Sequence, residues 1–203
     1  RTYAKIDGLG RWGGDVGVTD VTSGIRQAMI EAEVGPESVT YLTCLDQSFP
    51  RAGDPAVDGL LDVYRTPEHP LNCALGIASS QTGSVLTVIK TILALNRRFL
   101  PASDDGVGPE MPDQWMDTPF YGVARSKPWF AEGPKRIAVV HGGGDTPESH
   151  GGHVIVSEAA QPLMSDAVIS RSEYVLVPLG AGSRKGFEER LTVLEAQIDA
   201  VET

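Results

Sequence analysis

The feature that most constrains the fold is a glycine-rich segment between two apolar runs, within residues 136–158. One apolar run, at residues 137–140, leads into the glycines, and a second, at residues 154–156, follows them. Such runs are typical of buried strands, and glycine permits the tight turns and close backbone approach that join them. The segment therefore predicts two adjacent strands with a site near their ends, where α/β proteins place ligands.

The preceding part of the chain alternates strand-like and helix-like segments. The alternation predicts an α/β fold, a mixed and mainly parallel five-stranded sheet with helices on both faces. Numbering the strands in chain order, we expect the sheet order 3-2-1-4-5. Thr22 or Ser23 is the expected N-cap of the first helix. The predicted strands cover residues 2–6, 39–45, 72–77, 137–140 and 154–156, and the helices residues 20–33, 54–64 and 81–95.

A second, smaller element is expected after residue 160. Residues 159–172 form a polar connector, residues 174–179 resemble a strand, and residues 184–201 have the apolar spacing of an amphipathic helix. We therefore expect a domain at residues 1–160 and a connector with a strand–helix linker element at residues 161–203.

Composition narrows the function classes. The 203 residues carry a formal net charge of −10, which argues against a nucleic-acid partner. No apolar run approaches the roughly 20 residues that a membrane-spanning helix needs, and no signal peptide opens the chain. We expect a cytoplasmic protein in which Cys44 and Cys73, both within apolar runs, are buried reduced thiols.

Two motifs suggest small ligands. Gly8, Gly10 and Gly13 match the G-x-G-x-x-G pattern of dinucleotide sites, but the predicted helix starts too late to present its first amides to a pyrophosphate. The pattern is therefore interpreted as a strand exit, with a dinucleotide-binding module as an alternative.

A histidine-rich cluster at the glycine-rich segment has the donor types of a metal site. Its members lie on a loop rather than a helix face and have no nearby cysteine, so we expect hydrogen bonds to the backbone and no metal. The members are His141, His150, His153, Asp145 and Glu148.

The order of these pieces resembles the C-terminal half of a β-ketoacyl synthase, the thiolase-like condensing enzyme of fatty acid and polyketide synthases. The closing segment, residues 150–159, is similar to the last strand of that half, and residues 174–198 resemble the linker that follows such domains in modular synthases. The other similar segments are residues 2–10, 25–42, 74–76 and 88–102.

The resemblance implies an active site that this chain lacks. The family uses a cysteine, carried by the N-terminal half, and two histidines. Leu45 occupies the position of the first histidine, and no histidine occurs between residues 71 and 140, where the second belongs. Aliphatic Leu45 cannot donate a hydrogen bond to an oxyanion. The chain therefore resembles the non-catalytic, chain-length-factor type, and residues 119–130 are most similar to polyunsaturated fatty acid synthases.

We therefore predict a non-catalytic, pocket-shaping or structural segment of a synthase, without a cofactor, with Leu45 and residues 79–84 facing the cleft. The resemblance implies as partners an N-terminal ketosynthase half or another copy of the chain, and acyl carrier protein and acyl thioesters in the full synthase. The alternative is an active acyltransferase that has recruited His141 or His153.

The helix predicted at residues 81–95 supports the expectation of a partner. It is apolar or small on most of its circumference, and Lys90 is its one charged residue. A surface helix of a self-sufficient domain carries more charge on its outer face. We therefore expect another protein surface to cover it.

Overall fold

The computed structural model describes residues 2–13, 17–45, 53–65, 72–78, 83–102, 118–131, 133–142, 150–159 and 183–199. The chain divides into two compact units, Arg1–Ala160 and Gln161–Thr203. The second unit contains helix α4 (Arg184–Asp199), close to the predicted helix. The strand predicted at residues 174–179 lies outside the described residues.

The first unit is built on a mixed sheet with helices on both faces, as predicted. Strand β8 runs antiparallel to both of its neighbours, β1 and β7, while β2 is parallel to both β3 and β7. A small second sheet pairs β4 (Phe99–Leu100) with β6 (Lys127–Pro128). In sheet order the six main strands are β1 (Ala4–Trp12), β8 (Gly151–Glu158), β7 (Ile137–Gly142), β2 (Tyr41–Cys44), β3 (Cys73–Ile77) and β5 (Phe120–Gly122).

The predicted strand order was wrong. Strand β1 forms one edge of the sheet beside β8, instead of lying between the second and fourth strands. It pairs antiparallel with β8 from Ala4↔Glu158 to Trp12↔Gly151, a ladder longer than the short first strand that we predicted. The sheet also has a sixth strand, because β5 pairs with β3 at the opposite edge.

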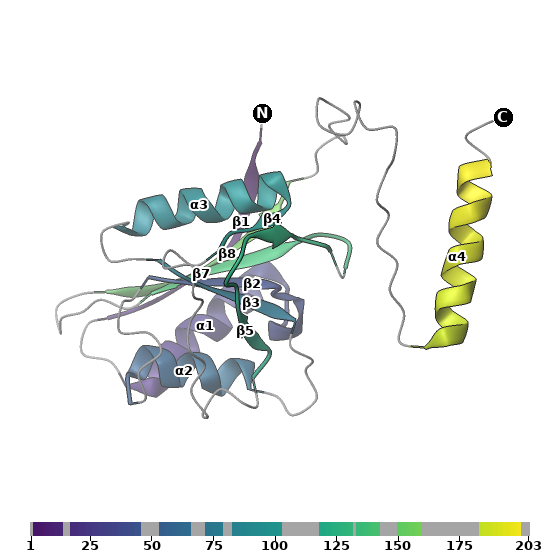
Figure 1. Cartoon of the computed structure of the whole chain (residues 1–203). Helices are drawn as coiled ribbons and strands as arrows, with labels where there is room; N and C mark the ends of the chain where they lie inside the picture. The colour runs from purple at the N-terminus through teal and green to yellow at the C-terminus, as the bar shows by residue number, and fades with distance from the viewer. Residues whose placement is uncertain are drawn as a thin grey trace. The chain divides into compact units, whose positions relative to one another are not determined.

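Three helices cover the two faces of this sheet (Figure 1). Helices α1 (Val18–Ala32) and α2 (Pro55–Tyr64) lie on one face, and α3 (Gly83–Arg97) lies on the other. The predicted N-cap of α1 was wrong, since the helix begins earlier, with the backbone N–H of Gly17 donating to Asp20 Oδ2 at 3.1 Å. The α2 prediction was accurate: Asp54 caps the helix and Pro55 opens it.

The face that carries α1 and α2 holds the larger apolar core. Side chains from α1, α2 and the central strands pack together there, and the prediction of buried thiols is confirmed by two free, buried cysteines. Burial of this size supplies most of the folding free energy of a small domain. The largest fully buried apolar members of the cluster are Ile25, Leu42, Leu60, Tyr64, Leu75 and Ile155.

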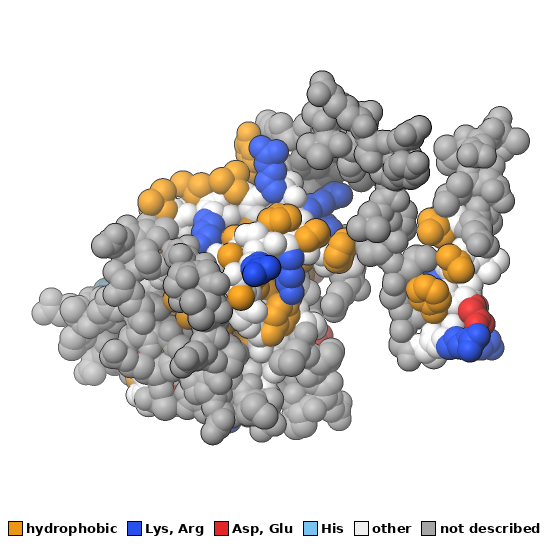
Figure 2. All heavy atoms as spheres, viewed as in Figure 1, with side chains coloured by type: hydrophobic (Ala, Val, Ile, Leu, Met, Phe, Trp, Pro, Cys, Tyr) orange, Lys and Arg blue, Asp and Glu red, His pale blue; other side chains and the backbone are white. Residues whose placement is uncertain are grey.

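The opposite face is covered differently. Helix α3 buries Thr87, Thr91, Ala94 and Leu95 against the sheet, and the last two belong to a second apolar cluster. The hydroxyls of Thr91 and Thr43 lie 3.4 Å apart, within hydrogen-bond distance. Several other large apolar side chains of α3 point outward, where Figure 2 shows an orange row along the helix. The exposed apolar residues are Val85, Leu86, Ile89 and Leu93, with Phe99 just beyond the helix.

Candidate functional site

The candidate site lies at the carboxyl ends of β2, β3 and β7, which meet at one edge because these strands are parallel. Leu45 continues β2 and donates its backbone N–H to the carbonyl of His141 at 2.9 Å. Ala78 continues β3 and donates its backbone N–H to the Cys44 carbonyl at 2.9 Å. The backbone therefore aligns the three strand ends closely.

The described residues at the ends of these strands carry no polar side chain. A Cβ added to Gly142, the last residue of β7, would lie 2.6 Å from the Leu45 Cβ, so Leu45 occupies the space above a glycine. Leu45 is partly buried and Ala78 is buried. Neither donates a side-chain hydrogen bond or carries charge, so neither can stabilise an oxyanion.

The structure tests the predicted cleft residues only in part. Residues 79–82 and the connection at residues 143–149 lie outside the described residues. Gly83 and Ser84 are described, as the start of α3.

His141 and His153 lie beneath this edge, inside the core on the α1 and α2 face. They sit directly opposite each other on β7 and β8, with their Nδ1 atoms 3.1 Å apart. His141 Nε2 lies 3.2 Å from the Ala56 carbonyl, and His153 Nε2 lies 3.4 Å from the Tyr64 hydroxyl. Both imidazoles are fully buried, so a substrate arriving from solvent cannot reach them in this conformation.

Burial also sets their protonation. Desolvation lowers the pKa of His141 to about 4, although the Ala56 carbonyl acts in the opposite direction. Desolvation, and then the neighbouring His141, hold the pKa of His153 well below its ordinary value. Both rings are therefore neutral at pH 7 and shielded from solvent, which disfavours general acid–base work by either.

The proposed metal donors do not converge among the residues that the structure describes. His150 is exposed just before β8, whereas His141 and His153 are buried partners of each other. Asp145 and Glu148 lie outside the described residues. Across the described part of the chain, no three histidine, cysteine, aspartate or glutamate side chains are grouped as metal ligands would be.

The glycine pattern at the N-terminus is neither a strand exit nor a phosphate loop. Gly8 and Gly10 lie inside strand β1. A Cβ added to Gly10 would lie 1.8 Å from the Gly24 carbonyl oxygen of α1, and one added to Gly8 would lie 2.1 Å from the Ala28 carbonyl oxygen. Both glycines therefore serve the close packing of strand against helix, and no room remains there for a pyrophosphate.

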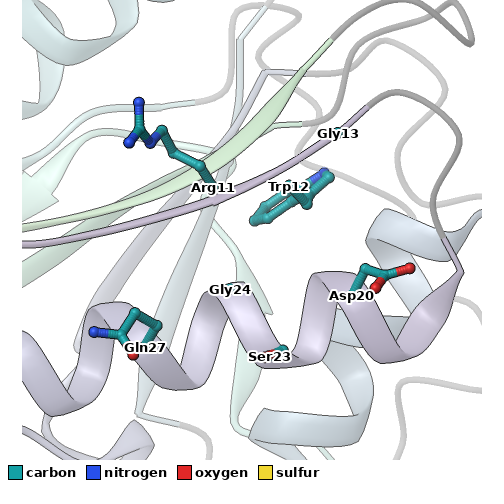
Figure 3. A pocket seen from close by; sticks show the side chains of 7 residues that line it. All are labelled: Arg11, Trp12, Gly13, Asp20, Ser23, Gly24 and Gln27. Atoms are coloured by element: carbon teal, nitrogen blue, oxygen red, sulfur yellow. The ribbon is translucent and has the colours of Figure 1, made fainter.

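A polar pocket of about 510 Å³ lies beside this contact, between the end of β1 and α1 (Figure 3). Among the described residues, its lining does not present a row of loop amides at a helix N-terminus, which a dinucleotide requires. The Arg11 side chain points away from α1 in Figure 3. The lining residues are Arg11, Trp12, Gly13, Asp20, Ser23, Gly24 and Gln27.

Sequence reasoning missed Tyr64 and Trp12 as neighbours of the histidines. The Trp12 ring centroid lies 5.3 Å from that of His141. A sequence signal for the pair existed: in an antiparallel pair that aligns Val140 with Val154, residues 141 and 153 are necessarily opposite. Because glycines flank both histidines, the sequence suggested a loop there, whereas the strands extend through Gly142 and Gly151.

The sequence of this chain is similar to parts of known polyketide synthases. No family model matches the chain. It is 28% identical over 188 residues to the polyketide synthase GfsA of Streptomyces halstedii, covering 86% of this chain and 2% of that protein. It is 26% identical to a phenolphthiocerol/phthiocerol polyketide synthase component of Mycobacterium tuberculosis, covering 86% of this chain and 12% of that component. The chain thus spans only a small part of these relatives.

Solved structures of ketosynthases share the fold. A ketosynthase from module 6 of the bacillaene synthase of Bacillus subtilis superposes with a TM-score of 0.65 at 20% identity, covering 79% of this chain and 31% of that one. The oxazolomycin ketosynthase domain OzmH KS8 of Streptomyces albus gives a TM-score of 0.63 at 18% identity, covering 78% and 46%. The chain therefore has the thiolase-like ketosynthase fold and resembles part of a polyketide synthase.

None of the described helices is both long and apolar enough to cross a bilayer.

Proposed function

We propose that this chain is the C-terminal half of a ketosynthase-like domain that shapes a pocket in a cytoplasmic polyketide or polyunsaturated fatty acid synthase without catalysing condensation. The observation that carries the proposal is the apolar strand edge at Leu45, Ala78 and Gly142, with His141 and His153 sealed in the core. Losing one oxyanion donor costs roughly 10²–10³ in rate.

The exposed face of α3 supports a second half as the partner. Leu86, Ile89, Leu93 and Phe99 line an apolar depression of about 400 Å³ on the outer side of this helix. Figure 2 shows this apolar row continuing along α3. Soluble monomers rarely expose large contiguous apolar patches, so such a patch marks a contact surface. We infer that an N-terminal ketosynthase half covers it, with a second copy of this chain as the competing occupant.

Malonyl decarboxylation tests the non-catalytic claim. The chain alone, and the chain with Leu45→His, are each mixed with malonyl-loaded acyl carrier protein, and carbon dioxide release is measured. We expect no release above buffer from either, because one restored histidine supplies neither the second histidine nor the cysteine. Release above buffer by the unaltered chain would contradict the proposal.

The pocket-shaping role is tested separately in the intact synthase. Leu45→Phe adds volume at the strand edge and is expected to shift the product distribution toward shorter acyl chains. Leu9→Phe, on edge strand β1 and 45% exposed, is the matched control and is expected to leave the distribution unchanged. An unchanged distribution in Leu45→Phe, at normal protein level, would contradict pocket shaping by this edge.

A further inference from the structure

The buried histidine pair belongs to a longer polar cluster that its neighbours complete. Its members come from three elements: His141 from β7, His153 from β8, and Ala56 and Tyr64 from α2. The Nδ1–Nδ1 separation is 3.1 Å, and the two outer contacts measure 3.2 and 3.4 Å. Polar groups sealed in a core are costly unless they are hydrogen-bonded, so the direction of each bond matters.

The Ala56 carbonyl determines the direction of every hydrogen bond in this cluster. The Ala56 carbonyl oxygen can only accept, so His141 must carry its proton on Nε2. A neutral His141 then has a bare Nδ1, which can only accept, so His153 must donate from Nδ1–H. The remaining nitrogen, His153 Nε2, is bare and accepts from the Tyr64 hydroxyl. With both rings neutral, one arrangement of protons satisfies every atom in the row.

We propose that Tyr64, His153 and His141 form one directional hydrogen-bond chain, ending at the Ala56 carbonyl, that fastens both ends of α2 to the sheet and breaks when a histidine gains a proton. Ala56 lies in the first turn of α2 and Tyr64 is its last residue. The chain therefore anchors the helix at two points about two turns apart. This inference does not depend on the synthase role proposed above.

An added proton disrupts this arrangement. Protonation of His141 at Nδ1 sets two N–H groups against each other at 3.1 Å, whereas protonation of His153 at Nε2 forces the Tyr64 hydroxyl to turn and accept instead of donate. Burial raises the pKa of Tyr64, and the neighbouring thiols of Cys73 and Cys44 raise it further. The buried side chains in the described part of the chain include no carboxylate, lysine or arginine that could compensate a charge there.

The sign of the pH effect follows. Both histidines have a lowered pKa in the folded protein, so folding favours their neutral forms. The stabilisation is fully present above the unfolded-state pKa of 6.5 and decreases as the pH falls toward about 4, the value for folded His141. Opening of α2 in acid should therefore take up about one proton per histidine.

Nitrogen NMR of the histidine rings in the unaltered 203-residue chain at pH 7.5 tests the assignment. We expect His141 to carry its proton on Nε2 and His153 on Nδ1, which is the less common tautomer of free histidine. Two Nε2–H rings, or a charged ring at this pH, would overturn the proposal. Because this measurement uses the native sequence, it does not depend on any variant folding.

His141→Phe then tests the coupling. The variant removes the acceptor of the His153 Nδ1–H, so His153 is expected to lose its single tautomer and show a mixture. If His153 keeps its proton entirely on Nδ1 in a folded His141→Phe variant, the proposed hydrogen-bond chain is contradicted. His150→Gln is the matched control, because His150 is exposed just before β8 and takes no part in the hydrogen-bond chain.

Hydrogen exchange tests the fastening. After correction for intrinsic rates, amides of α2 in the native chain are expected to exchange at least tenfold faster at pH 4.5 than at pH 7, with a smaller change in α1. His150→Gln should behave like the native chain. Equal acid sensitivity of α1 and α2 would overturn the claim that the histidines hold α2 in particular.

Discussion

The two faces of the sheet differ in how their helices use apolar side chains. On one face, α1 and α2 bury their large residues against the strands, and even the polar atoms of His141 and His153 are partnered there. On the other face, α3 buries Thr87, Thr91 and Leu95 against the sheet but leaves a row of large apolar residues, from Val85 to Leu93, exposed. The first face is complete within this chain, whereas the second has the composition of an interface.

The comparison is tested most strongly by a matched pair of leucines. Leu60, on α2, is fully buried, whereas Leu86, on α3, is 55% exposed. We expect Leu60→Ala to lower the free energy of unfolding by about 2–5 kcal/mol, since it leaves a cavity in a packed core. Leu86→Ala should change it by less than about 0.5 kcal/mol in the isolated chain. Chemical denaturation measures both, and equal losses would show that α3 is part of a closed core.

The glycine contact between β1 and α1 offers a second test of the completed face. Gly10→Ala would place a methyl group 1.8 Å from a carbonyl oxygen of α1, so strand and helix must separate. We expect a loss of about 1–3 kcal/mol, typical of overpacking. Gly13→Ala is the control, because no heavy atom lies within 4 Å of its added Cβ. A stable Gly10→Ala would mean that the contact is looser than described.

Glu158, the last residue of β8, predicts a third effect. Its carboxylate accepts from Arg136 at 2.7 Å and from Arg98 at 2.9 Å. Partial burial opposes ionisation, but Arg136 and then Arg98 outweigh it and hold the pKa of Glu158 below its ordinary 4.5. We expect Glu158→Gln to cost about 1.5–3 kcal/mol at pH 7, the range for hydrogen bonds to charged groups.

The pH dependence of the free energy of unfolding provides a control for Glu158→Gln. A lowered pKa means that the stabilisation is present above about pH 4.5 and is lost as the pH falls through the folded value. The difference between Glu158→Gln and the native chain should therefore shrink in acid. A difference that stays constant from pH 7 to pH 3 would show that the ion pairs contribute nothing to it.

The smallest expected stability effect tests the exposed face itself. Leu93→Gln replaces a 46% exposed apolar side chain of α3 by a polar one of similar size. We expect the free energy of unfolding of the isolated chain to change by less than about 0.5 kcal/mol. Association with the upstream half, measured by calorimetry, should weaken at least tenfold. Ile30→Gln, on α1 and 71% exposed, is the control and should leave association unchanged.

Much of this architecture could be predicted from the sequence, because local patterns encode it. The apolar runs gave the central strands, and the helix predicted at residues 54–64 corresponds to α2. The strand order could not be obtained this way, since the pairing of β1 with β8 joins segments about 150 residues apart. The glycines in β1 misled because the same residue permits a turn and a close helix contact.

Less of the candidate site than of the fold could be predicted from the sequence. The resemblance identified Leu45, and the structure aligns it with Ala78 and Gly142 at one sheet edge. The pairing of His141 with His153 depended on a strand register that the glycines concealed. Tyr64, the partner of His153, lies 89 residues away in the chain and carries no local signal.

Hydrogen exchange across α3 tests the central claim most directly. Exchange is measured in the 203-residue chain at a concentration where it is monomeric, and again in a longer chain that includes the upstream half. We predict that amides of α3 exchange faster than those of α1 in the isolated chain, and that the upstream half slows α3 while α1 is unchanged. A monomer whose α3 is as well protected as α1, with no change on adding the upstream half, would contradict the account.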